Sequence, residues 1–115
     1  MLIYISLPYT GCEEQSKIRS IEMSNTILKL VPNATIVNPI LNFGFVDDTV
    51  SYKKCINMCL ELLDKCDIIV YEGSSKGVEM EKEKAIESWV KIFKYEDLDE
   101  LVEYTSKYGG KLWLV

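Results

Sequence analysis

The sequence has no histidine among its 115 residues. This absence excludes Ser-His-Asp and Cys-His arrangements, in which imidazole activates the nucleophile, and metal sites that depend on imidazole. Any catalysis must therefore use carboxylates, tyrosine, lysine or thiols. Cysteines are few, and no two of them stand in a Cys-x-x-Cys spacing. The four are Cys12, Cys55, Cys59 and Cys66. We interpret them as free thiols in a reducing compartment, and expect no metal and no cofactor.

Long apolar runs and basic clusters are also missing. No run approaches the roughly 18 residues that a membrane span needs, and no basic segment of the kind that begins a secretory signal precedes the first apolar run. The 18 acidic residues outnumber the 13 lysines and arginines, so the net charge is −5. Long nucleic acids bind through Lys and Arg, so we expect neither a long nucleic acid nor a membrane as partner. The prediction is a soluble, cytoplasmic protein, for which a small nucleoside or nucleotide remains a suitable ligand.

The chain does contain a regular alternation of short apolar runs and amphipathic segments, over a length that suits one domain, residues 1–115. The predicted strands are 2–6, 34–40, 66–73, 90–93 and 111–115, and the predicted helices are 13–31, 51–64, 76–89 and 96–108. Strands that alternate with helices form parallel sheets covered on both faces. We therefore predict a three-layer α/β domain, flavodoxin-like or Rossmann-like, with a five-stranded sheet in the order 2-1-3-4-5.

Helical periodicity predicts which side chains face the core. In the first helix these are Ile18, Ile21, Ile27, Leu28 and Leu30, and in the third helix they are Val78, Ala85 and Trp89. Glu81 and Lys82 flank the stripe of the third helix, whereas Glu79 and Glu83 point to solvent, where Glu79 pairs with Lys82. The periodicity leaves open whether Glu81 is a functional residue or part of the rim.

The loop after the third strand, Ser74-Ser75-Lys76-Gly77, opens the third helix. Its hydroxyls, its backbone N–H groups and the positive end of the helix favour an anion, phosphate above all. Ligands of such sheets bind beyond the carboxyl ends of the strands, where this loop lies. Simple capping of the helix by Ser74 or Ser75 explains the same residues, so both interpretations stay open.

Tyr4 lies inside the first aliphatic run, in the strand predicted at the centre of the sheet. A buried phenol usually needs a hydrogen-bond partner. A carboxylate just past the third strand is a suitable acceptor, because the third strand neighbours the first in the predicted order. The alternative is a core aromatic without a functional role.

At these residues the chain resembles a known family. The segments "IYISLPYTG", "VNP" and "CDIIVY…SKGVEMEKEKA" are similar to the nucleoside 2-deoxyribosyltransferase superfamily, which includes deoxynucleoside 5′-monophosphate N-glycosidases and small bacterial and phage relatives. The similarity spans about Leu2 to Phe93. Its most specific element is Ser-x-Gly-x-x-x-Glu-x-x-x-Ala, which matches Ser75, Gly77, Glu81 and Ala85.

The resemblance implies roles for individual residues. Glu81 matches the nucleophile that attacks the anomeric carbon, and Tyr4 matches the tyrosine that orients this carboxylate. Ser75 matches a position that is serine in members that bind a phosphate. The expected substrate-binding residues are Ser75, Gly77, Ser74, Ser6 and Asn38.

The implied activity is cleavage or transfer at the N-glycosidic bond of a (deoxy)nucleoside or its 5′-monophosphate, through a glycosyl-enzyme intermediate. The resemblance also implies a homodimer or higher homo-oligomer, for which Trp113 and the end "KLWLV" are a candidate interface. The alternative is a non-catalytic nucleotide or nucleotide-sugar binding protein on the same fold.

The chain departs from the family pattern in three places. Cys59 stands where many relatives have an aspartate that contacts or protonates the base, and a neutral thiol is a weak proton donor. Leu7-Pro8 stands after the first strand, where many relatives have Gly-Pro. In relatives a Gly-Trp and a spacer often follow the third strand, whereas in this chain Gly73 is followed directly by Ser74. The candidates left for base protonation are Asp47, Asp48 and Glu79.

Overall fold

The computed structural model describes the backbone of residues 1–112 and the side chains of residues 1–107. In chain order its elements are β1 (Leu2–Ser6), α1 (Glu13–Leu30), β2 (Thr35–Val37), α2 (Pro39–Asn42), α3 (Tyr52–Leu63), β3 (Ile68–Tyr71), α4 (Lys76–Glu87), β4 (Lys91–Lys94), the 3₁₀ turn η1 (Tyr95–Asp97) and α5 (Leu98–Leu112). The predicted alternation of strands and helices is confirmed through β4, with one correction. The predicted strand 34–40 is wrong beyond Val37, because Asn38 caps the short helix α2, with Pro39 as its first residue.

The strands form one parallel sheet in the order β2-β1-β3-β4. Tyr4 of β1 lies opposite Val37 of β2 and Ile69 of β3. The chain therefore leaves β1 in one direction to reach β2 and crosses back to reach β3, which places the switch in strand order between β1 and β3. Such a switch is where ligands bind in sheets of this kind.

The predicted fifth strand is wrong where the structure describes it. The sequence predicts a turn at Gly109-Gly110, but α5 continues through both glycines to Leu112. Glycine lowers helix stability by only about 1 kcal/mol per residue, so a helix anchored on the sheet tolerates it. Residues 113–115, which include Trp113 of the predicted interface, lie outside the described residues.

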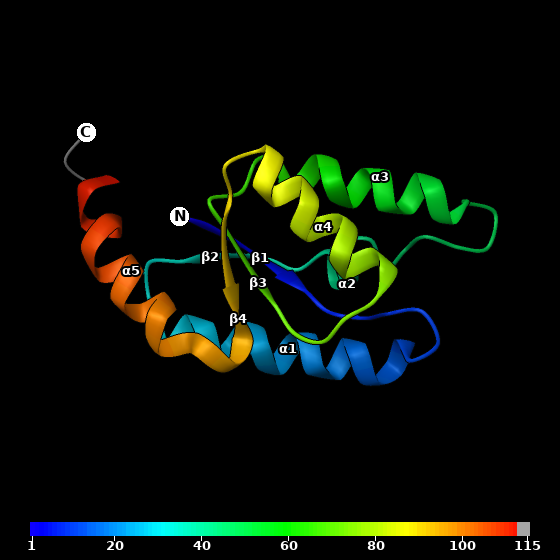
Figure 1. Cartoon of the computed structure of the whole chain (residues 1–115). Coiled ribbons are helices and arrows are strands. Elements are labelled where there is room, and N and C mark those ends of the chain that lie inside the picture. The colour runs from blue at the N-terminus through cyan, green and yellow to red at the C-terminus, as the bar shows by residue number, and fades with distance from the viewer. Residues whose placement is uncertain (113–115) are drawn as a thin grey trace.

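Helices cover both faces of the sheet, with α3 and α4 on one face and α1 and α5 on the other (Figure 1). The core on the α1 and α5 side includes Ile3, Ile5, Met23, Ile27, Ile68, Val70, Phe93 and Leu101. The core on the α3 and α4 side includes Tyr4, Leu63, Cys66, Ile69, Ala85 and Val90. Alternate residues of β1 thus serve opposite faces, and Tyr4 points toward α3 and α4.

The inward face of α1 differs from the predicted one. Its buried residues are Ser16, Ser20, Met23 and Ile27. Of the predicted set only Ile27 is buried, whereas Ile18, Ile21, Leu28 and Leu30 are 39% to 61% exposed. The two serines donate their hydroxyls to backbone carbonyls, so their burial leaves no unsatisfied polar group. The predicted face is wrong because apolar periodicity cannot anticipate a buried side that contains serines.

Trp89 does not face inward as predicted, since it is 94% exposed. α4 ends at Glu87, and Trp89 has a φ of +60°, in the left-handed region. The N–H of Val90 then donates back to the carbonyl of Ala85 at 2.8 Å, a common way to close a helix. The helical period stops before Trp89, so it no longer predicts where this side chain points. Val78 and Ala85 are buried, as predicted.

Candidate active site

A cavity of about 680 Å³ opens beyond the carboxyl ends of the strands, at the switch between β1 and β3. Its lining comes from the end of β1 and the loop that follows it, from the first residue of α1, from α2 and the loop after it, from α3, and from the first two turns of α4. Most of the wall is apolar, through Leu7, Ile40, Phe43, Val46, Tyr52 and Ile56. An apolar cleft with a few polar groups is the usual form of a small-molecule site.

Glu81 is the buried carboxylate of this cavity, with only 7% of its surface exposed. The Tyr4 hydroxyl donates a hydrogen bond to Oε2 of Glu81, and the Ser6 hydroxyl donates to Oε1 at 3.0 Å. Tyr4 and Ser6 share one face of β1 because side chains alternate along a strand. Both carboxylate oxygens are therefore held from one strand, and the expected contact between positions 4 and 81 is present.

Burial and hydrogen bonding act in opposite directions on the pKa of Glu81. Burial penalises the charged form, whereas the donors Tyr4 and Ser6 favour it. Burial dominates and raises the pKa of Glu81 to about 7. Burial, and next the charge of Glu81, raise the pKa of Tyr4 well above its ordinary range. The phenol therefore keeps its proton and donates it in a hydrogen bond, while at neutral pH the carboxyl group is a mixture of both forms.

Cys59 of α3 also lines the cavity and lies beside the hydroxyl of Tyr4. Burial, followed by the charge of Glu81, raises the pKa of the Cys59 thiol to about 11. The thiol is neutral at physiological pH and gives up its proton reluctantly. Cys55, one turn earlier on α3, lines the same wall.

The start of α4 forms the polar end of the cavity, with Ser75, Lys76 and Gly77 in its lining. Ser75 is the N-cap of α4, and its hydroxyl oxygen accepts from the N–H of Val78 at 3.1 Å. The nearest atom to a Cβ added at Gly77 would be the Tyr52 hydroxyl oxygen, at an ordinary 3.5 Å. Protein packing therefore does not require glycine at this position.

Ser74 and Asn38, two of the predicted substrate-binding residues, do not line the cavity. The Ser74 hydroxyl donates to Glu79 at 3.3 Å. Asn38 is the N-cap of α2, where its Oδ1 accepts from the N–H of Leu41, and its amide donates to Ser24. Asn38 thus acts on the cavity indirectly, since it begins the short helix that brings Ile40 to the wall. Ser6 contacts Glu81 instead of the open space.

The three candidate acids for base protonation are all absent from the cavity lining. Asp47 accepts from the hydroxyl and the N–H of Thr49, which lower its pKa. Asp48 lies beside it in the same loop and is exposed. Glu79 pairs with Lys82 at 3.6 Å on the outer side of α4, as predicted. None of the three carboxyl groups lines the space where a leaving base would lie.

Sequence reasoning missed two features of the cavity. Glu13 lines it from the start of α1, where it accepts from the N–H of Gly11 and where backbone hydrogen bonds lower its pKa. Phe43 and Val46 line it from the loop after α2. The aromatic, apolar composition of "LNFGFV" in a predicted loop was the available signal, because apolar loop residues often line binding sites.

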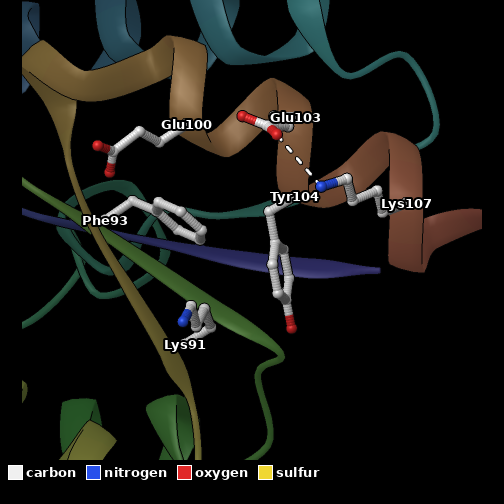
Figure 2. Close-up of a pocket in the computed structure, with 6 residues that line it drawn as sticks. All are labelled: Lys91, Phe93, Glu100, Glu103, Tyr104 and Lys107. Carbon is white, nitrogen blue, oxygen red and sulfur yellow. Dashed lines mark hydrogen bonds and ion pairs between the residues drawn. The ribbon is translucent and has the colours of Figure 1, made fainter.

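A second, smaller hollow of about 220 Å³ lies between β4 and α5 (Figure 2). Its Phe93 and Tyr104 rings have centroids 5.4 Å apart, and Lys107 pairs with Glu103 at 3.2 Å. It shares no lining residue with the cavity around Glu81. Since none of its described lining residues is a buried carboxylate or a thiol, we take the larger cavity as the candidate active site.

Residues 1–112 contain no helix that combines the length and apolar character needed to cross a membrane. Within the described part of the chain, no three His, Cys, Asp or Glu side chains gather as a metal site. A scan of the chain against protein-family models and a search of curated proteins both found no match.

Proposed function

We propose that the protein cleaves or transfers the N-glycosidic bond of a (deoxy)nucleoside or its 5′-monophosphate, with Glu81 as the nucleophile. The observation that carries the proposal is the buried carboxylate of Glu81, oriented by Tyr4 and Ser6 at the wall of an apolar cavity. A glycosidic carbon needs an ionised, fixed carboxylate close to it, and two donors on one strand supply the fixation.

In the proposed reaction a carboxylate oxygen of Glu81 attacks the anomeric carbon as the base departs. Tyr4 stays protonated and keeps the carboxylate in place throughout. The resulting glycosyl ester is then attacked by water or by a second base, which regenerates the carboxylate. Because the pKa of Glu81 is about 7, we expect kcat/KM to rise with pH through that region as the free enzyme becomes ionised.

The polar end of the cavity supports a phosphorylated substrate. The N-terminus of α4 offers the positive end of its dipole, the Ser75 hydroxyl and the Lys76 ammonium group on the same side. Gly77 lets a ligand approach the backbone there. Transfer and hydrolysis use the same intermediate, so the proposal covers both.

One observation favours a second candidate, a nucleotide or nucleotide-sugar binder without turnover. The residue beside Tyr4 is the neutral thiol of Cys59, which is a poor acid for a leaving base. A binder needs no such acid.

Base release from a panel of nucleosides and nucleotides, followed by chromatography, tests the proposal. Glu81→Gln keeps the size of the side chain but removes the nucleophile, so we expect release to fall by about 10³-fold or more. Glu79→Gln, on the exposed side of the same helix, is the matched control and should release base like the wild type. Thermal stabilisation by a nucleotide without product, in wild type and Glu81→Gln alike, would instead establish the binder.

We also propose that the protein is cytoplasmic and that it forms a homodimer or a higher homo-oligomer. All four cysteines are free, as suits a reducing cytoplasm. For the homo-oligomer, Ile18, Ile21 and Leu28 form an exposed apolar stripe on α1. Sedimentation of the purified chain measures whether it forms a dimer.

A further inference from the structure

The cavity around Glu81 holds few charged groups. Glu13, Lys76 and Glu81 are the charged side chains in its lining, and the other polar groups are hydroxyls and thiols. The lowered pKa of Glu13 keeps this exposed carboxyl ionised, so it has no proton to give. Lys76 is exposed at the start of α4, next to the expected phosphate. Cys59 holds its proton tightly. Among the residues that the structure describes, the cavity thus contains the proposed nucleophile but no carboxylic acid placed to protonate a leaving base.

An ordinary nucleobase leaves poorly without protonation, because cleavage of the C1′–N bond deposits the electron pair on a ring nitrogen. A positioned acid typically accelerates such a step by about 10²–10⁴-fold. A base that already carries positive charge leaves as a neutral molecule and needs no acid.

We propose that the cavity takes N-glycosides whose leaving base is cationic, such as an N-ribosyl pyridinium nucleotide or an N7-alkylated purine nucleotide. The inference rests on the proposed function, with Glu81 as nucleophile, and it specifies the substrate class. It is carried by the composition of the cavity wall, with one buried carboxylate, a neutral thiol and apolar surface.

The reaction balances without an added proton donor. Glu81 forms an ester bond to C1′ as the C1′–N bond breaks, and the electron pair of that bond moves to the ring nitrogen, which leaves the base neutral. Carboxylate and cation thus give a neutral ester and a neutral base. Water then attacks C1′, the carboxylate leaves, and one proton passes to solvent.

The surroundings of Glu81 favour a cation for a second reason. The groups that face its carboxyl are Tyr4 and Ser6 from β1 and Cys59 from α3, and none of these is positively charged. The lysine nearest to Glu81 in the sequence is Lys82. Its Nζ pairs with Glu79 and lies 4.3 Å from the centroid of the Tyr71 ring. A cationic ligand supplies the missing positive charge and lowers the pKa of Glu81 toward its ordinary value.

The apolar wall suits the same ligand. Phe43 and Tyr52 line the cavity with aromatic rings, which attract a flat cation through their faces. A flat, charged base can thus be held between an aromatic wall and a carboxylate without any side chain that hydrogen-bonds its edge.

The test compares base release from N7-methylguanosine 5′-monophosphate and nicotinamide mononucleotide with release from guanosine 5′-monophosphate. The cationic compounds also release base more readily in buffer alone. Release by Glu81→Gln, measured in parallel, is therefore subtracted for each substrate. We expect Glu81-dependent kcat/KM to be at least about 100-fold higher for the cationic substrates. Cys59→Asp places a buried acid beside the leaving base and should raise release from guanosine 5′-monophosphate, whereas Cys59→Ser, the matched control, should not.

The outcomes separate this inference from the function on which it rests. Equal Glu81-dependent release from both substrate classes by the wild-type protein overturns the inference and leaves the N-glycosidase intact. Release from neither class overturns the proposed function and the inference together. If the wild-type protein prefers the cationic substrates and Cys59→Asp reduces this preference, both the proposed function and the inference are supported.

Discussion

At the scale of single residues, the ionisation of Glu81 affects stability and, in the proposed reaction, activity. Its carboxyl receives two hydrogen bonds, yet burial outweighs them and raises its pKa to about 7. A carboxyl whose pKa rises from its ordinary value of 4.5 to about 7 on folding opposes folding when it is ionised. The proposed reaction needs the same ionised form for nucleophilic attack, so the proposed function and stability make opposite demands on this side chain.

Glu81→Gln should therefore stabilise the protein at alkaline pH. Compared with the ionised form, the protonated carboxyl of Glu81 favours the folded state. This contribution to the free energy of unfolding is complete below about pH 4.5 and is lost as pH rises through about 7. The glutamine side chain of the variant stays neutral, so at pH 8 we expect the free energy of unfolding of Glu81→Gln to exceed that of wild type by about 2–3 kcal/mol. Near pH 5 the difference should fall to about 1 kcal/mol or less. Urea denaturation at both pH values measures the effect.

Glu79→Gln is the control for this prediction, since Glu79 lies on the same helix and is exposed. It should leave the pH dependence of stability unchanged. A wild-type protein as stable at pH 8 as Glu81→Gln would show that the carboxyl is not penalised by burial, and the proposed rise of kcat/KM near pH 7 would lose its basis.

At the scale of elements, α4 contributes to both ends of the candidate site. Its N-cap and first residues, Ser75 to Gly77, line the polar end, and its second turn carries Glu81. Helix capping by Ser75 and anion binding by the loop are compatible. Capping uses only the hydroxyl oxygen of Ser75, which accepts from the N–H of Val78. The hydroxyl hydrogen remains available to a phosphate oxygen.

Ser75→Ala and Ser51→Ala separate capping from substrate binding. Ser51 caps α3 as Ser75 caps α4, each by accepting one backbone N–H. Both substitutions should lower the free energy of unfolding by about 1 kcal/mol. Only Ser75→Ala should raise KM for a nucleoside monophosphate, by about tenfold, since a hydrogen bond to a charged group is lost. Steady-state kinetics and urea denaturation of the two variants measure these effects.

The corresponding nucleoside without phosphate provides the internal control, and its KM should be the same in both variants. If Ser75→Ala and Ser51→Ala bind the monophosphate equally well, Ser75 is a helix cap only and the phosphate lies elsewhere in the cavity.

At the scale of the whole molecule, the sheet carries one core on each face, and both cores border the candidate site. Tyr4 and Glu81 belong to the side of α3 and α4, whereas the aliphatic residues of β1 that alternate with Tyr4 pack under α1 and α5. The bidentate pair of Arg19 with Glu72, at 2.7 Å to each carboxylate oxygen, joins α1 to the segment after β3. The core under α1 therefore supports β1, and its members Ile5 and Leu7 also line the cavity.

Two isoleucines of α1 test how this helix lies on the sheet. The periodicity predicts that both are buried, but Ile27 is 0% exposed and Ile21 is 44% exposed. Ile27→Ala should lower the free energy of unfolding by about 2–5 kcal/mol, and Ile21→Ala by about 0.5 kcal/mol or less. Chemical denaturation of the two variants measures this, and similar losses would mean that α1 is rotated from the position described.

The local pattern of the chain predicted the alternation of strands and helices through β4, although it missed α2. The strand order through β4 was predicted from the usual topology of such sheets, and the pairing of Tyr4 with Glu81 from the family resemblance. The pattern failed at Ile21 and at Trp89, where serines lie under a helix and where a left-handed residue ends one. It also failed at Gly109-Gly110, where the helix continues.

The sequence by itself determined the helices and strands up to β4 except α2, and which carboxylates follow the third strand. Only the tertiary structure decided that Glu81 is buried, that Cys59 lies beside Tyr4, and that the candidate acids for base protonation stay outside the cavity. The physical reason is that pKa and proton supply depend on which groups surround a side chain, and those groups come from β1, α3 and α4, which are far apart in the chain.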